Sequence, residues 1–288
     1  MTIAPIEEAN LGHAIDLLAE GFGAKPNPAF WRAMIERLDD FGGNKSAGVP
    51  FGYLMYDQGK PVGVVLTPAS LRPGADGGAS KVVVNLSSAY VRPEHRWRTP
   101  LLFRAPTRLK PDVIYDVTPT EKVKDILVAL GFRQISRGVV VNLLPLTALC
   151  PPWSGKIIAL ADAENGAIDP AIQRLLLAHE KYGCVAAALE VQGRTIPLLF
   201  KVNKPKTGDP RAASLLYCPD LPLLHAHLAP VAGFLLRQRA LTLRLEMPLE
   251  GRTPPGIGRP GREVKFVLGR LEPGTLDYAG TELALFDI

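Results

Sequence analysis

Apolar residues in the first half of the chain alternate between the spacing of strands and the spacing of helices. Residues 2–6 form a short apolar run, and Leu11, Ile15 and Leu18 then recur on one face of a helix. Pro28 is a favourable first helical residue, so we expect a second helix from there to the next Gly-Gly pair. The chain is therefore predicted to begin with a strand followed by two helices.

The rest of this half predicts more strands and one further amphipathic helix. Two apolar runs around "QGK" at 58–60 indicate a hairpin, and residues 81–91 (KVVVNLSSAYV) are apolar enough for a central strand. After a basic turn we expect a short helix, a strand at 112–119 and a helix that ends at Gly131. One or two strands close this half.

The second half repeats this order with parts missing. A linker that contains Pro151 and Pro152 separates the halves, so we predict two domains, 1–146 and 155–288. The elements expected in the second half are a strand at 156–162, a helix capped by Asp169, a hairpin around Gln192-Gly193, a strand at 211–219, one long helix at 221–239, a strand at 241–248, a flexible loop that contains "GIGRPG" at 256–261, and final strands "EVKFVLG" at 263–269 and "ELALFDI" at 282–288.

Composition limits the class of protein. The 288 residues are 47% hydrophobic and carry a formal net charge of +5, which is modest for a nucleic-acid-binding protein. The first residues lack the pattern of a secretory signal, and no uncharged apolar run reaches the roughly 18 residues of a membrane span. Three scattered cysteines do not make a disulfide framework. We therefore expect a soluble, cytoplasmic protein with no role at a membrane.

The strongest local charge lies between residues 92 and 110, which contain six arginines and lysines and, before Lys110, one acidic residue, Glu94. The segment follows the central strand and leads into Thr99-Pro100, a good helix start. A basic loop that opens a helix is a common way to hold a phosphate, although such loops are usually rich in glycine and this one has none. A solvated surface turn, an acidic partner and a nucleic acid are the alternatives, and the modest net charge disfavours a nucleic acid.

Three motifs in this order resemble the GNAT acyl-CoA N-acyltransferase superfamily. "GKPVGVV" at 59–65 is similar to its hairpin, "VRPEHR" at 91–96 to the end of its central strand, and "YDVTPTEKVKDILVALGFRQI" at 115–135 to its next strand and helix. The resemblance covers residues 1–144, and the second half resembles the fold only in the order of its elements. It implies a mixed α/β protein of two GNAT-like domains, the second one reduced.

The resemblance also implies a ligand and its site. In this family acyl-CoA lies between two splayed parallel strands, with its pyrophosphate on the amides of a glycine-rich loop. That loop pattern starts here at Arg96, but Thr99 and Leu101 stand at its glycine positions. The residues expected to contact acetyl-CoA or another acyl-CoA are the backbones of Ala89, Tyr90 and Val91 for pantetheine, and Arg96, Arg98 and Thr99 for the phosphates.

Catalytic groups are harder to find in the sequence. Leu127 stands where many relatives have a general-acid tyrosine, and the central strand carries no carboxylate. Tyr115 and Asp116 on the next strand are the nearest titratable pair, and a packed tyrosine beside a turn aspartate is the plainer interpretation. No pattern of metal ligands is found. We therefore expect an acyltransferase that acts on an unidentified amine or, alternatively, a non-catalytic GNAT-like module that binds a ligand or a protein.

Overall fold

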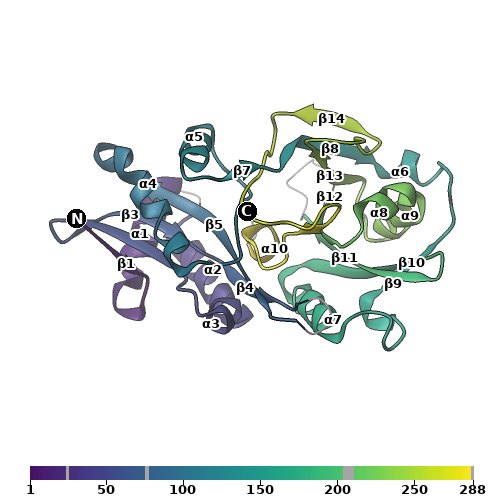
Figure 1. Cartoon of the computed structure of the whole chain (residues 1–288), viewed down its shortest axis with the longest axis horizontal. Helices are drawn as coiled ribbons and strands as arrows, with labels where there is room; N and C mark the ends of the chain where they lie inside the picture. The colour runs from purple at the N-terminus through teal and green to yellow at the C-terminus, as the bar shows by residue number, and fades with distance from the viewer. Residues whose placement is uncertain (24–25, 75–77, 204–210, 287–288) are drawn as a thin grey trace. The chain divides into compact units, whose positions relative to one another are not determined.

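The computed structural model describes residues 1–23, 26–74, 78–203 and 211–286, and it is a mixed α/β structure as expected (Figure 1). The chain forms two compact units. Within the described ranges, unit 1 comprises Met1–Gln134, Lys265–Arg270 and Gly280–Phe286, and unit 2 comprises Ile135–Val264 and Leu271–Ala279. None of the helices in these ranges is long and apolar enough to cross a membrane.

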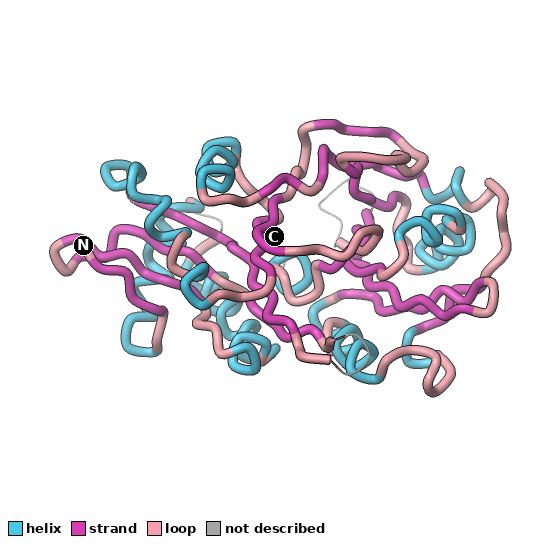
Figure 2. The backbone as a smooth tube through the Cα atoms, in the orientation of Figure 1, coloured by secondary structure: helices cyan, strands magenta, loops and turns pink. Residues whose placement is uncertain are grey.

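Unit 1 is built on a mixed sheet that contains eight strands among the described residues (Figure 2). Its order is β1-β2-β3-β5-β6-β15-β7, with β4 paired to β5, and only the β5–β6 pair is parallel. The strands are β1 (Thr2–Pro5), β2 (Gly52–Asp57), β3 (Lys60–Leu66), β4 (Ala69–Arg72), β5 (Lys81–Val91), β6 (Val113–Asp116), β7 (Arg133–Gln134) and β15 (Phe266–Gly269).

The helices of unit 1 have local signals that explain their bounds. Asn27 accepts a hydrogen bond from the Phe30 N–H at 2.9 Å and so caps the second helix, whose buried face includes Trp31 and Leu38. Gly42 ends that helix in the left-handed conformation. The α-helices are α1 (Leu11–Phe22), α2 (Pro28–Phe41), α3 (Gly43–Ala47), α4 (Thr99–Phe103), α5 (Glu121–Ala129) and α10 (Glu282–Leu285).

Unit 2 repeats the strand order of unit 1. Its sheet runs β9-β10-β11-β12-β13-β8-β14, and β12–β13 is the parallel pair. The strands are β8 (Ser136–Leu143), β9 (Lys156–Ala159), β10 (Cys184–Val191), β11 (Arg194–Val202), β12 (Ala212–Cys218), β13 (Thr242–Pro248), β14 (Ile257–Pro260) and β16 (Leu276–Asp277), and the helices are α6 (Leu144–Thr147), α7 (Pro170–Leu177), α8 (Leu221–Ala226) and α9 (Leu228–Arg237). The unit is reduced in its helices, because the described residues between β13 and β14 form no counterpart of α5.

The two sheets exchange one strand each. β8 follows β7 in the sequence, yet it pairs with β13 and β14 in unit 2. β15 lies far along the chain, yet it pairs with β6 and β7 in unit 1. The expected domain bounds of 1–146 and 155–288 stay a prediction, and the compact units themselves divide after Gln134 and are each discontinuous in sequence.

Three expectations about local structure were wrong. "GIGRPG" contains β14 rather than a loop, because glycines at 138 and 256 let its backbone approach β8; a Cβ at Gly138 would lie 2.4 Å from the Arg259 carbonyl oxygen. "ELALFDI" contains α10 rather than a strand, and its leucine and alanine favour a helix. The long helix at 221–239 breaks at His227, because the Pro230 ring is incompatible with a continuous helix through the Ala226 carbonyl.

Candidate functional site

The parallel strands of unit 1 stop pairing partway along β5. Their register runs from Val83–Val113 to Leu86–Asp116, while β5 continues to Val91 with β3 on its other side. We call the point after Leu86 and Asp116 the fork of unit 1, and the unpaired side of β5 beyond it the free edge. No strand among the described residues pairs with this edge. The splayed strands expected from the sequence are therefore present.

The backbone direction along the free edge follows from one hydrogen bond. The Arg92 N–H donates to the Val62 carbonyl oxygen at 2.9 Å, so Arg92 faces β3 with its backbone. Hydrogen-bonded pairs alternate along an antiparallel ladder, so Tyr90 also faces β3, while Ala89 and Val91 direct their N–H and C=O groups to the free edge. Of the three predicted pantetheine contacts, two lie on this edge, and the backbone of Tyr90 is already used by the sheet.

A bulge turns the strand just past the fork. The register of β5 against β3 shifts beside Ser88, which has a φ of +48°. Beyond the bulge, Tyr90 packs its ring on Gly21 of α1, where a Cβ would lie 2.3 Å from the ring. The Tyr90 hydroxyl donates to Glu20, and Arg92 pairs with the same carboxylate at 3.0 Å. These contacts hold the end of β5 against α1.

The basic turn after β5 differs from a phosphate loop in its use of donors. Residues Pro93–Arg98 form a 3-10 helix that leads directly into α4. The N–H and the hydroxyl of Thr99 both donate to the Arg96 carbonyl oxygen, the hydroxyl at 2.7 Å. The expected contact of Thr99 with a phosphate stays a prediction, and in this structure both of its donors are used inside the turn. An amide cradle of the glycine-rich kind does not fit these residues.

Guanidinium groups remain at this turn. Arg98 lies 3.5 Å from Asp57 and stacks over the exposed Trp97 ring at 4.3 Å. Arg96 is exposed and makes no ion pair within the described ranges. The turn therefore fits a phosphate that is bound by side chains, since guanidinium groups can bind phosphate in a bidentate manner.

Two buried carboxyl groups lie at the fork. Asp116 is the β6 member of the last strand pair, and burial raises its pKa to about 7 against the opposing effect of a Thr118 backbone hydrogen bond. Glu282 of α10 accepts hydrogen bonds from the hydroxyls of Ser87 on β5 and Thr118 after β6. Burial, reinforced by the charge of Asp116, raises the pKa of Glu282 to about 8 although the Thr118 hydrogen bond lowers it.

The sequence analysis found Asp116 but missed Glu282. Tyr115, the other candidate, is buried before the fork in register with Asn85. Glu282 is separated from Ser87 by 195 residues and lies in a segment that was interpreted as a strand. The one available signal was an acid in the otherwise apolar run "ELALF", which is unusual for a buried segment.

The corresponding fork of unit 2 is filled by the chain itself. β12 and β13 pair from Ala212–Thr242 to Ser214–Arg244, and the short strand β16 then pairs with Tyr217 and Cys218 at the end of β12. The Tyr278 N–H extends this contact to the Leu216 carbonyl oxygen at 2.7 Å. An extended peptide therefore occupies in unit 2 the kind of edge that is free in unit 1.

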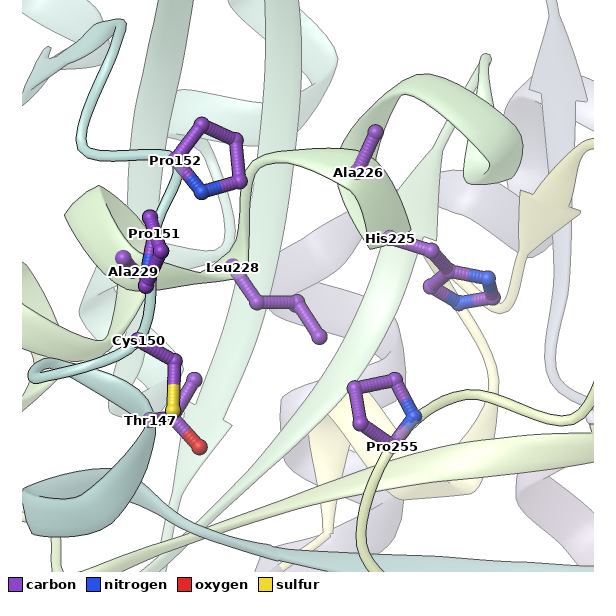
Figure 3. A pocket seen from close by; sticks show the side chains of 9 residues that line it. All are labelled: Thr147, Cys150, Pro151, Pro152, His225, Ala226, Leu228, Ala229 and Pro255. Carbon is purple, nitrogen blue, oxygen red and sulfur yellow. The ribbon is translucent and has the colours of Figure 1, made fainter.

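Unit 2 also has a small surface hollow (Figure 3). Cys150 and His225 line it, but Leu228 lies between them and the imidazole points away from the sulfur. Its volume is about 110 Å³, which is below the roughly 300 Å³ at which ligand pockets begin. The hollow therefore offers neither a cysteine–histidine pair nor room for a substrate.

Comparison with known proteins gives matches only at the level of structure. No protein-family model and no curated protein matches the sequence. A GCN5-related N-acetyltransferase from Anabaena variabilis is similar with a TM-score of 0.56 and 10% identity, over 92% of this chain and 72% of that one. A probable N-acyltransferase of unknown function from Enterococcus faecalis gives a TM-score of 0.56, 11% identity and the same coverage.

A third solved structure agrees with these two. A GCN5-related N-acetyltransferase from Kribbella flavida has a TM-score of 0.51 and 15% identity, over 92% of this chain and 70% of that one. Identities this low speak for the fold alone. The matches span both units, whose sheets share one strand order and one parallel pair at the same place. The chain therefore has the fold of the GCN5-related N-acetyltransferases, in a tandem arrangement of two units.

Proposed function

We propose that unit 1 binds an acyl-CoA along the free edge of β5 and transfers the acyl group to an amine. The observation that carries this proposal is the fork, where the parallel strands part and leave the backbone groups of Ala89 and Val91 without a strand partner. Pantetheine is an extended chain with two amide groups, so it can pair with such an edge as a short strand does. β16 pairs with the edge of β12 in this way in unit 2.

The phosphates of the ligand would contact side chains. Arg96 is exposed and has no ion pair within the described ranges. Arg98 pairs with Asp57 at 3.5 Å, which is longer than a strong ion pair. Both guanidinium groups can therefore turn toward an anion. The Thr99 amide does not take this role in the present geometry, because it already donates to the Arg96 carbonyl oxygen. Binding by guanidinium groups predicts a weaker and more salt-sensitive complex than a glycine-rich cradle gives.

The chemistry requires one proton acceptor and one donor to a developing oxyanion. The amine nitrogen attacks the thioester carbonyl carbon, the C–N bond forms and the C–S bond breaks. The ammonium proton passes to the Asp116 carboxylate and then to the departing thiolate. A group with a pKa of about 7 suits both transfers near neutral pH. The Ala89 N–H, which faces the free edge, would stabilise the oxyanion.

The alternative is a binding module without turnover. It is favoured by the spent donors of Thr99 and by the position of Glu282 at the fork, where the reacting carbonyl would lie. This alternative predicts that acyl-CoA or a related ligand binds while no thiol is released in the presence of any amine.

Calorimetric titration with acetyl-CoA tests the binding step. We expect micromolar affinity in the native protein, at least tenfold weaker affinity in Arg96→Ala, and unchanged affinity in Arg262→Ala, which removes an exposed arginine of unit 2. No binding at millimolar acetyl-CoA would refute the proposal.

Release of free CoA then separates the two candidate functions. The acceptors are a lysine peptide, a diamine and an amino sugar, and the matched variant is Asp116→Asn, which keeps the size of the side chain. Turnover that falls at least a hundredfold in Asp116→Asn, with binding retained, supports the transferase. Binding with no turnover for any acceptor supports the module.

A further inference from the structure

Residues 280–286 follow a fixed path across unit 1, and we call them the strap. Gly280 has a φ of +72°, and a Cβ there would lie 2.5 Å from the Ser70 hydroxyl oxygen, so only glycine fits. The Leu285 carbonyl oxygen accepts a hydrogen bond from Arg37 of α2 at 3.3 Å. Leu285 and Phe286 are buried. The strap is therefore packed against the unit rather than lying loosely on it.

The strap has a single acidic side chain, and that side chain spans the fork. Ser87 is the first β5 residue after the last parallel pair, and Thr118 comes two residues after Asp116 on the other strand. The carboxyl of Glu282 is hydrogen-bonded to both hydroxyls at once. It therefore bridges the two strands at the point where they part, and the strap covers the narrow end of the free edge.

A second observation points to the same place. Asn85 is buried, and its side-chain oxygen and nitrogen have no hydrogen-bond partner in the part of the chain that the structure describes. It lies two residues before Ser87, so the two side chains share one face of β5. Leaving both atoms unpaired in a buried site costs free energy, and exposure to water or to a polar ligand would recover it. The two unpaired Asn85 atoms therefore destabilise the closed arrangement relative to an open one in which they contact water or a ligand.

We propose that the strap is a lid on the fork of unit 1, with Glu282 as its latch. The latch holds while the Glu282 carboxyl is protonated, since it can then stay buried as a neutral group that both hydroxyls contact. It releases when the carboxyl ionises, because a buried anion without a cation partner is far more costly than a solvated one.

The groups around Glu282 determine whether the strap opens or closes as pH rises. Ser87 of β5 and Thr118, two residues after β6, contact the Glu282 carboxyl, and Asp116 of β6 lies close enough to raise its pKa. Arg37 contacts the strap at the Leu285 carbonyl oxygen rather than at the carboxyl. No cation is among the groups that shift its pKa, which burial raises to about 8. The docked strap is thus fully stabilised below the ordinary glutamate pKa of 4.5 and loses this stabilisation as pH rises through about 8.

Hydrogen exchange of the intact protein tests the lid without any ligand. The Ala284 and Leu285 amides bond to Thr281, and the Phe286 amide bonds to Glu282, so their protection reports docking. After correction for intrinsic exchange rates, we expect their protection to fall about tenfold between pH 7 and pH 9, the change that one carboxyl with a docked pKa of about 8 gives.

The decisive variant is Glu282→Gln, which keeps the shape and the hydrogen bonds but cannot ionise. Protection in this variant should stay constant over the same pH range, whereas the control Glu250→Gln, an exposed glutamate of unit 2, should behave like the native protein. Equal pH dependence in the native protein and Glu282→Gln, or full protection of the native strap at pH 9, would overturn the proposal.

The link to the acyl-CoA site is measured separately and rests on the proposed function. Acetyl-CoA should bind at least fivefold more tightly to the native protein at pH 9 than at pH 7, while Glu282→Gln should show no such gain. If the strap opens as pH rises but acetyl-CoA binds to neither state, the lid proposal is supported and the proposal that acyl-CoA is the ligand is refuted. If affinity is independent of pH although the strap opens, the lid does not control this site.

Discussion

The two units have the same strand order and differ in what occupies their forks. In unit 2 a peptide strand pairs with the end of β12 and uses its backbone groups. In unit 1 no strand among the described residues pairs with the equivalent edge of β5, and the Glu282 side chain bridges the fork. Both fillings come from one stretch of chain, residues 276–286. Eleven residues near the end of the sequence are therefore enough to make the two forks different.

The comparison also explains why strand order alone does not assign an activity. Both sheets provide a parallel pair that separates, which is the feature a pantetheine chain needs. A filled edge cannot bind such a chain, and a free edge can. The proposed ligand site is therefore assigned to unit 1, while β16 covers the corresponding edge within unit 2.

The largest expected effect comes from a charge in the exchanged strand. Val267 lies fully buried at the centre of β15, between β6 and β7. Val267→Asp places an unpaired carboxylate there and should cost at least about 4 kcal/mol, a large part of the stability of a domain. Hydrogen exchange should show loss of protection in unit 1 with unit 2 retained. Equal loss in both would mean that the two sheets unfold as one, and Arg270→Asp, at an exposed position, serves as the control.

The next effect separates the two forks. Leu276→Ala removes a buried side chain from β16 and should destabilise unit 2 by about 2–4 kcal/mol. Urea unfolding measures the cost, and Leu249→Ala, at an exposed leucine of the same unit, should cost under about 0.5 kcal/mol. Acetyl-CoA affinity should stay within about twofold of the native value, since one unit carries the site. A large loss of affinity would place part of the ligand site in unit 2.

The pH dependence of stability should also differ between the units. Folding raises the pKa of Asp116 from 3.8 to about 7 and that of Glu282 from 4.5 to about 8, so folded unit 1 binds more protons than the unfolded chain. Its stability should fall as pH rises from 6 to 9, by up to about 1.4 kcal/mol per pH unit for each proton.

The matched variant for this measurement is Asp116→Asn combined with Glu282→Gln, in which the slope should vanish. In unit 2 burial raises the pKa of Cys218 from 9.0 to about 12 and lowers the pKa of His225 from 6.5. The stability of unit 2 should therefore rise with pH up to about 6.5 and fall only near pH 9 and above, so its hydrogen exchange should change little between pH 7 and pH 8. A matching slope in unit 2 would show that the carboxyl groups at the fork are not the cause.

The smallest effect compares one helix start in each unit. Asn27 caps α2 in unit 1 and Asp220 caps α8 in unit 2, each through a hydrogen bond to a backbone N–H near 3 Å. Replacement by alanine should cost about 1 kcal/mol at either site, as thermal unfolding would show. Thr120 precedes α5 but makes no side-chain cap, so Thr120→Ala should be nearly neutral. A clear loss in Thr120→Ala would indicate another role for that side chain.

Local patterns in the sequence predicted local structure well. The helix at α2 follows from Asn27, Pro28 and the apolar spacing after them, and the strand β5 from its β-branched run. The splayed parallel pair was implied by the resemblance to the acyltransferase family, whereas the bulge beside Ser88 was not predicted. The signals for α2 lie in the helix itself and in the residue before it, which is why they can be interpreted from the sequence alone.

The fork could not be predicted in full, because its parts come from distant segments. Asp116 was found beside its own strand, but Glu282 reaches Ser87 from 195 residues away. The exchange of β8 and β15 could not be predicted for the same reason, because the apolar pattern of a strand does not indicate which sheet the strand joins. The phosphate contact of Thr99 stays a prediction, and only the geometry of the 3-10 turn reveals that its donors bond to the Arg96 carbonyl oxygen.

The exchanged strand β15 has a consequence for how the protein is made. The sheet of unit 1 lacks its strand between β6 and β7 until residue 269 has left the ribosome. At about 5–20 residues per second, the first 134 residues wait roughly 7–30 seconds for that strand, with the edges of β6 and β7 unpaired. During synthesis the amino-terminal half therefore exposes two unpaired strand edges, which are surfaces at which unfinished chains tend to aggregate.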